Sequence, residues 1–139
     1  MNEIIKGMGF HHIALRCKDI DKSIEFYKAI GCVVTTVWGT PPHHSAMVDI
    51  GDGGRIELFS GGVEETTESD TRSGEWLHLA VTSDDPDAAF ATAIAAGATE
   101  KFAPYDAMIS SDPPMPLRIA FVYGPDKEVI EFFHVKEQA

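Results

Sequence analysis

The chain has 139 residues, 44% of them hydrophobic, which is enough for one compact core and too little for two independent domains. Its 22 acidic residues outnumber its 11 Lys and Arg residues, the formal net charge is -11, and no basic run occurs. We therefore expect neither nucleic acid nor an anionic membrane as a partner, and, since the chain shows no signal-peptide core or long apolar run, we expect a cytoplasmic protein.

The first half of the chain predicts a β-α-β-β-β module over residues 8–60. Alternating side chains from Phe10 to Cys17 indicate a strand, with Ile13 and Leu15 on one face. Apolar residues at helical spacing follow, and Gly31 ends the predicted helix. Three further strands are predicted over Cys32–Trp38, Ser45–Ile50 and Arg55–Phe59.

A polar, glycine-containing stretch over residues 61–74 predicts a linker to a second module, residues 75–135. The predicted elements of this module are a strand over Trp76–Thr82, an alanine-rich helix that ends at Gly97, and strands over Leu117–Tyr123 and Glu128–Val135. The segment Ala103–Pro116 contains four prolines. We expect it to be a long loop that serves as a lid or as a wall of a substrate site.

The two modules carry the same residues at similar spacing. His12 and His78 are 66 residues apart, and so are the helix-ending Gly31 and Gly97. The glutamates of the last strands, Glu57 and Glu131, are 74 residues apart. This agreement indicates an internal duplication, so we predict one α+β domain, residues 8–135, built from two tandem modules.

Strand alternation places four chemically active side chains on the faces turned away from the predicted helices. They are two imidazoles and two carboxylates, His12, Glu57, His78 and Glu131. Ionised carboxylates facing a cavity need a compensating positive charge. Arg16 and Arg55 share this face and could supply two ion pairs. A divalent metal ion is the other possibility, and the duplication favours it, because each half contributes one histidine and one glutamate.

Two aromatic residues, Phe59 and Phe133, share the inward face with the glutamates and are candidates for an apolar pocket wall. The other four histidines, among them the outward-facing His134, receive no role in the predicted site. His11 points away from the ligand face and is expected at the surface. His43 and His44 follow two prolines and are expected in a loop.

These motifs, His12-Ile-Ala-Leu-Arg16, Ile56-Glu57-Leu, His78-Leu-Ala-Val and Asp126-x-x-x-Ile-Glu131, resemble the vicinal oxygen chelate superfamily, which includes glyoxalases, bleomycin resistance proteins and dioxygenases. The likeness to bacterial glyoxalase I is the greatest. The resemblance implies a cupped, mostly antiparallel sheet around one divalent ion (Zn, Ni, Co, Mn or Fe), held in a homodimer. It also implies His12, Glu57, His78 and Glu131 as the ligands.

For function, the resemblance implies a metal-dependent lyase or isomerase acting on a small molecule with adjacent oxygens. A proton would move through a metal-bound enediolate, with Glu131 favoured over Glu57 as the base. Arg16 matches an arginine that holds the glutathione carboxylate in glyoxalase I, and Arg55, Phe59 and Phe133 are further candidates for substrate binding.

Two departures from glyoxalase I leave the substrate open. Gly61 stands where an asparagine is expected, and the proline-rich segment 103–116 replaces a glycine-rich substrate loop. Other functions within the superfamily remain as alternatives: an Fe(II) dioxygenase, an epimerase of CoA thioesters, and a binding protein that sequesters a drug.

Overall fold

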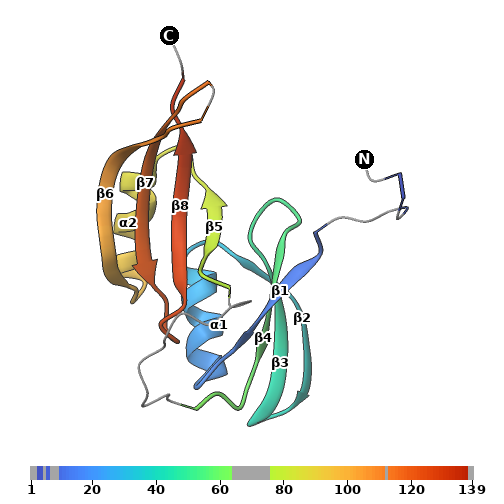
Figure 1. The fold of residues 1–139 in the computed structure, drawn as a ribbon. Coiled ribbons are helices and arrows are strands. Elements are labelled where there is room, and N and C mark those ends of the chain that lie inside the picture. Colours follow the sequence, from blue (N-terminus) through green and yellow to red (C-terminus); the bar gives the residue numbers. More distant parts are fainter. Residues whose placement is uncertain (1–2, 5, 7–9, 64–75, 112, 138–139) are drawn as a thin grey trace. The chain divides into compact units, whose positions relative to one another are not determined.

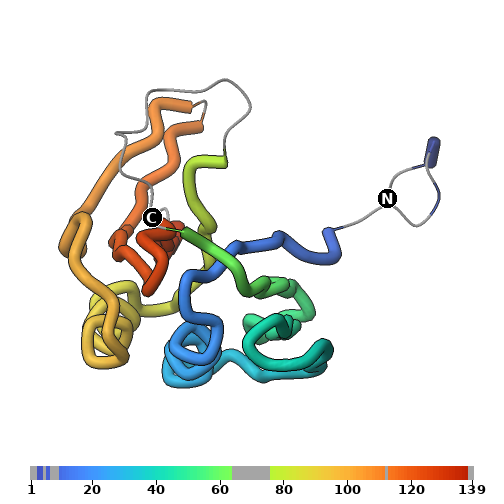
Figure 2. Tube along the Cα trace, turned by 90° about the horizontal axis from the view of Figure 1, so that it is seen from below, coloured from blue at the N-terminus to red at the C-terminus, as the bar shows by residue number. Residues whose placement is uncertain are grey.

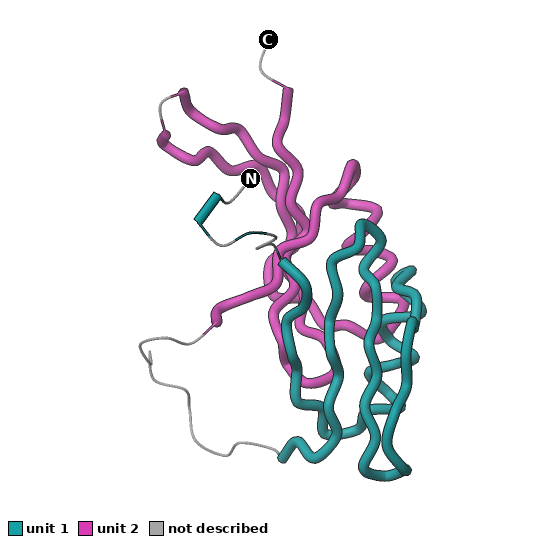
Figure 3. Tube along the Cα trace, turned by 90° about the vertical axis from the view of Figure 1, so that its right-hand side faces the viewer, with its two compact units in different colours: residues 1–64 teal, residues 65–139 magenta. Residues whose placement is uncertain are grey.

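A computed structural model of the chain describes residues 3–4, 6, 10–63, 76–111 and 113–137. The chain separates into two compact units, residues 1–64 (unit 1) and residues 65–139 (unit 2), shown in Figure 3. Each unit is a β-α-β-β-β module (Figure 1). The predicted α+β fold with two tandem modules is confirmed. Most of the predicted linker, residues 64–74, lies outside the described residues.

Unit 1 is a four-stranded sheet with one helix against it. Its elements are β1 (His12–Arg16), α1 (Ile20–Ala29), β2 (Val33–Thr40), β3 (His43–Asp49) and β4 (Arg55–Phe59). The strand order is β1-β4-β3-β2, and only β1 with β4 is parallel. The Asp19 side chain accepts a hydrogen bond from the Lys22 amide and so caps the start of α1.

Unit 2 repeats this order, and Figure 2 follows the course of its Cα trace by residue number. Its elements are β5 (Leu79–Thr82), α2 (Pro86–Ala95), β6 (Thr99–Ile109), β7 (Met115–Tyr123) and β8 (Val129–Val135), and its strand order is β5-β8-β7-β6. Asp85 caps α2, and Pro86 occupies its first turn, where a missing amide hydrogen costs nothing. With ten residues each, α1 and α2 are too short to cross a membrane.

The strand register shows that the duplication extends to single residues. In unit 1, Ala14 of β1 lies opposite Glu57 of β4. In unit 2, Ala80 of β5 lies opposite Glu131 of β8. The histidine of each unit stands two residues before that alanine. Each module therefore presents its histidine and its glutamate from the same two positions of its parallel strand pair.

The prediction of a long loop over Ala103–Pro116 is wrong. This stretch belongs to a β-hairpin, because β6 continues to Ile109 and β7 begins at Met115. Pro104 is tolerated because β6 is an edge strand and because the register shifts between Phe102 and Tyr105, where this proline lies. The eight extra residues of the second module lengthen this hairpin.

The core positions follow the predicted alternation in most strands. Ile56 and Leu58 are buried beneath α1, and Ile130 and Phe132 are buried beneath α2. The prediction fails at the start of the second module, where β5 begins only at Leu79 and the Leu77 side chain is 81% exposed. His78 therefore precedes its strand.

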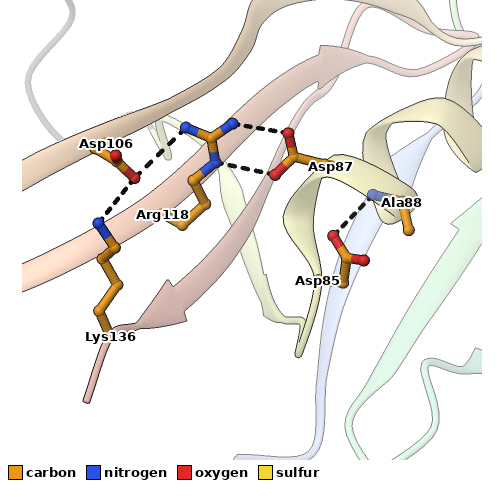
Figure 4. Close-up of polar contacts among 6 residues, drawn as sticks. All are labelled: Asp85, Asp87, Ala88, Asp106, Arg118 and Lys136. Carbon is orange, nitrogen blue, oxygen red and sulfur yellow. Dashed lines mark hydrogen bonds and ion pairs between the residues drawn. The ribbon is translucent and has the colours of Figure 1, made fainter.

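A charged network ties the α2 side of the second sheet together (Figure 4). Arg118 of β7 donates two hydrogen bonds to the Asp87 carboxylate of α2, from Nε at 2.9 Å and from the terminal nitrogen at 2.7 Å. Asp106 of β6 lies 3.5 Å from Arg118 and 3.1 Å from Lys136. These cations lower the pKa of Asp87 and of Asp106. The network shows which face of β7 looks toward α2.

Candidate functional site: a histidine–glutamate pair in each unit

In unit 2, His78 and Glu131 lie in contact on the face turned away from α2. His78 Nε2 is 3.1 Å from Glu131 Oε1. Glu131 is only 6% exposed, and burial raises the pKa of its carboxyl group, although the neighbouring His78 acts in the opposite direction. A carboxylate in this position depends on a positively charged or hydrogen-donating partner.

In unit 1, His12 and Glu57 form the corresponding pair. His12 Nε2 lies 3.5 Å from Glu57 Oε1. The two histidine side chains are equally exposed, at 37%, but the side chain of Glu57 is more accessible than that of Glu131, 17% against 8%. The structure thus brings together, within each unit, the histidine and the glutamate that were predicted as ligands.

His11 is a neighbour of this pair, which the sequence did not predict. Its Nδ1 lies 2.9 Å from Nδ1 of His12, and the two rings meet edge to face. His11 is exposed, as expected of a surface residue, but it is not remote from the predicted site, because its ring contacts that of His12. A ligating histidine commonly donates its second ring N–H to an acceptor, and His11 is placed to accept from His12.

The two arginines predicted near the glutamates have different surroundings. Arg16 donates to the backbone oxygen of Ser60 at 2.7 Å and lies over the Phe59 ring, 5.5 Å from its centre. Arg55 stands opposite His12 in the register of β1 and β4. In both units the charged neighbour found beside the glutamate is a histidine, so the arrangement differs from the predicted alternative of two arginine–glutamate pairs.

The predicted pocket residue Phe133 lies in β8, opposite Ile119 of β7 and Thr82 of β5. Sequence reasoning missed three other rings on this face: Phe102, Tyr105 and Phe121. Phe102 stands opposite Phe121, and Phe121 stands opposite Glu131. Alternation along Leu117–Tyr123 would have placed Phe121 on the same face of the sheet as the glutamate. Tyr105 could not be placed in this way, because the segment 103–116 was predicted to be a loop.

His44 is one of two histidines, with His43, whose predicted position in a loop is wrong. It lies in β3 rather than in a loop, is 7% exposed, and its Nε2 is 2.9 Å from Oδ1 of Asp21 in α1. Its Nδ1 is buried and has no hydrogen-bond partner among the residues that the structure describes. The side chain shares the helix-facing parity of Ala46, so it ties β3 to the start of α1 and belongs to the side of the sheet opposite Glu57.

The donor atoms of the two pairs suit a divalent metal ion. Imidazole nitrogen with carboxylate oxygen is a ligand combination found for Zn and for other first-row metals. Within the ranges that the structure describes, no group of three or more His, Cys, Asp or Glu side chains is close enough to hold an ion. Each unit thus offers two donor residues, His12 and Glu57 or His78 and Glu131.

The fold defines a protein of two tandem β-α-β-β-β modules, each with one histidine–glutamate pair. The family model of the Glyoxalase/Bleomycin resistance protein/Dioxygenase superfamily matches residues 9–132, and the chain belongs to this superfamily. Comparison with proteins of curated function gives no match.

Several solved structures share the fold at low sequence identity. A glyoxalase family protein from Enterococcus faecalis has a TM-score of 0.71 at 16% identity, covering 94% of this chain and 100% of its own. TioX from Micromonospora sp. ML1 has a TM-score of 0.66 at 21% identity, covering 91% and 98%. A glyoxalase I variant from Zea mays has a TM-score of 0.67 at 18% identity over 89% of this chain, which spans only 43% of that protein.

Proposed function

We propose that the protein is a divalent-metal-dependent isomerase or lyase of glyoxalase I type, acting on a small molecule with adjacent oxygens. The observation that supports this most is the repeated register: in both units a histidine stands two residues before the alanine that lies opposite a glutamate. A purely structural role for the pairs would not require the same two positions twice.

In this proposal the two pairs share one ion, which could be Zn, Ni, Co, Mn or Fe. His12, Glu57, His78 and Glu131 would hold it. A divalent ion bound to them would supply a positive charge that favours negative charge on the adjacent oxygens of a substrate. The contacts at 3.5 Å and 3.1 Å support the idea, because they already hold each imidazole beside a carboxylate.

The glutamates would also carry the proton between neighbouring carbon atoms. We favour Glu131 as the base, because it is the more buried of the two and therefore less hydrated. Arg16 is positioned by Ser60 and Phe59 to meet an anionic group of the substrate.

Metal content tests the shared ion directly. We expect about one divalent ion per chain in the wild type, and loss of nearly all of it in either His12→Ala or His78→Ala, because each variant removes one ligand of a common site. His43→Ala, an exposed histidine of β3, is the control. Half-occupancy in each single variant would show two independent sites and contradict the proposal, as would a wild type that binds no more metal than the double variant His12→Ala/His78→Ala.

Turnover tests the reaction and the base. The metal-loaded chain is assayed for isomerisation of a hemithioacetal and for exchange of the carbon-bound hydrogen of α-hydroxyketones in deuterated water. We expect Glu131→Gln to reduce the rate by about 100-fold or more, and Glu57→Gln to reduce it less. A chain that binds metal and oxygen chelators yet catalyses no exchange would be a binding protein, which would refute the enzymatic assignment.

The proposal includes a homodimer. The edge strand β2 carries two exposed valines, Val33 at 61% and Val37 at 58%, which are suited to burial against a second copy. Light scattering on the purified protein gives the mass, and a monomer at micromolar concentration would contradict this part of the proposal.

A further inference from the structure

We infer that Phe102, Tyr105 and Phe121 form an aromatic subsite that binds a flat ring carried by the oxygen-chelating ligand. The inference rests on the proposed function, since it assigns a substrate class to the same site. All the residues that carry it belong to unit 2, and they come from β6 and β7.

Strand parity places these rings on the functional face of the sheet. Arg118 of β7 contacts Asp87 of α2, so its side chain looks toward the helix. Phe121 is three positions further along the strand and therefore looks the other way. Its register partner in β8 is Glu131, and its register partner in β6 is Phe102.

The rings continue without a break from the imidazole of the proposed ligand. The centre of the His78 ring is 5.6 Å from that of Phe121, Phe121 is 5.7 Å from Phe102, and Phe102 is 6.3 Å from Tyr105. Every contact in this row is edge to face. Because each ring stands on edge against the next, the outer rings keep surface that a further ring can contact.

Exposure and charge show where a ligand could bind. Phe102 is 51% exposed and Tyr105 is 40% exposed, although both belong to a row that begins beside a buried carboxylate. Lys101 Nζ lies 5.5 Å from the centre of the Phe102 ring and 5.2 Å from that of Tyr123. This cation helps to orient Phe102 and adds a positive charge next to the row, which suits an oxygen-bearing ring.

Comparison of the two modules shows that the fold does not require two of these rings, Phe121 and Phe102. At the position of Phe121, opposite the glutamate, unit 1 has Met47. At the position of Phe102, unit 1 has Thr36, which lies opposite Met47. At the position of Tyr105, unit 1 has another aromatic residue, Trp38, so only that ring is common to both halves. Phe121 and Phe102, the two rings nearest the glutamate, are a feature of unit 2 alone, and their explanation is a ligand rather than sheet stability.

Two hydroxamates test the inference with the intact chain. Benzohydroxamate and acetohydroxamate both chelate through adjacent oxygens and differ by the aromatic ring. We expect calorimetry on the metal-loaded protein to show benzohydroxamate binding about tenfold more tightly, a factor in keeping with one aromatic contact and its buried area. Phe102→Ala should remove this preference and leave the affinity for acetohydroxamate unchanged.

Met108→Ala is the matched control, because Met108 is an exposed apolar residue of the same strand whose parity is opposite to that of Tyr105. It should keep the preference. Phe102→Leu, which retains apolar volume, should lose most of it, and circular dichroism checks that each variant is folded. Equal affinities of the wild type for both hydroxamates, or equal losses in Phe102→Ala and Met108→Ala, would overturn the inference.

Metal content, measured on the same samples, separates this inference from the proposed function. If the chain takes up metal and shows no ring preference, the subsite is refuted and the metal site stands. If the chain takes up no metal, saturation-transfer NMR with benzohydroxamate reports the ring contact alone. A ring signal that is present in the wild type and disappears in Phe102→Ala then supports the subsite without the metal. If the wild type gives no ring signal, both the subsite and the metal site are refuted.

Discussion

The carboxylate of Glu131 lies 3.1 Å from the imidazole of His78, although 53 residues separate the two in the chain. Parallel pairing of β5 with β8 produces this contact, because it sets Ala80 opposite Glu131. His78, two residues before Ala80, is thereby brought beside the glutamate. The same pairing of β1 with β4 brings His12 to Glu57. One topological feature, used twice, thus assembles both pairs.

His11 should tune the proposed metal site through His12. If His12 donates its Nδ1 hydrogen to Nδ1 of His11, the electron pair of its Nε2 remains free to ligate. We expect His11→Ala to weaken metal affinity by about tenfold, measured by competition with a chelator of known affinity. His43→Ala, which removes another exposed histidine of unit 1, should have no effect, and equal affinities in the two variants would contradict a role for His11.

His44 and Asp21 should be coupled in stability. Removing Asp21 leaves both nitrogens of a buried imidazole unpaired within the described part of the chain, where Nδ1 already has no partner. We expect Asp21→Ala to lower the free energy of unfolding by about 1–3 kcal/mol. In a His44→Leu background, which removes the buried polar group, the same change should cost only a few tenths of a kcal/mol through the helix dipole.

Urea unfolding of the four proteins of this cycle measures the coupling. His44→Leu alone should be close to neutral, since it also removes an unpaired buried nitrogen. An equal loss from Asp21→Ala in both backgrounds would show that the contact at 2.9 Å contributes nothing to stability.

Gly62 should not tolerate a side chain. A Cβ at this position would lie 2.7 Å from the carbonyl carbon of Cys17 and 2.9 Å from the amide nitrogen of Lys18. These are backbone atoms, and they are held in place because the Gly62 amide donates to the Cys17 oxygen at 2.9 Å. We expect Gly62→Ala to lower the free energy of unfolding by about 1–3 kcal/mol.

Gly54→Ala is the control for this substitution. Its Cβ would meet side-chain atoms of Asp52 and Ile50, which can move aside. Thermal unfolding compares the two variants, and a loss in Gly54→Ala as large as that in Gly62→Ala would remove the backbone contact as the cause.

The charged network of unit 2 should make the protein sensitive to acid. A hydrogen bond from Arg118 lowers the pKa of Asp87, and a hydrogen bond from Lys136, with Arg118 beside it, lowers that of Asp106. A carboxyl group whose pKa is lower in the folded state stabilises the fold above its unfolded pKa, about 3.9, and this contribution is lost as the pH falls through the folded pKa. Stability should therefore fall as the solution is acidified below about pH 5.

The variant Asp87→Asn tests whether the ion pair with Arg118 causes this sensitivity to acid. The variant should be less stable than the wild type at neutral pH, and the difference should shrink as the pH falls, because the wild-type carboxylate becomes protonated. Urea midpoints between pH 7 and pH 3 measure the effect, and 1 M salt should reduce it, since the groups are partly exposed. A pH-independent difference, or the same curve in the control Asp84→Asn, would rule out the ion pair as its source.

Local periodicity was sufficient to predict much of the protein. Alternation with a period of two identified the buried residues Ile56 and Leu58, and it placed Glu57 on the opposite face, because neighbouring side chains of a strand point in opposite directions. The repeated spacing of His12 and His78 predicted the duplication, since two copies of one module carry equivalent residues at similar separations. The face of each side chain depends only on residues that are near in sequence, and the duplication is recognised from spacing alone.

Only the tertiary structure decided which groups accompany these residues. The sequence allowed Arg16 or Arg55 beside the glutamates, whereas the strand register places a histidine beside each. The sequence also could not show that His44 lies against α1, or that the proline-rich segment 103–116 forms a hairpin along the row of rings. Such contacts join residues far apart in the chain, and their geometry is set by strand pairing and helix packing rather than by any local pattern.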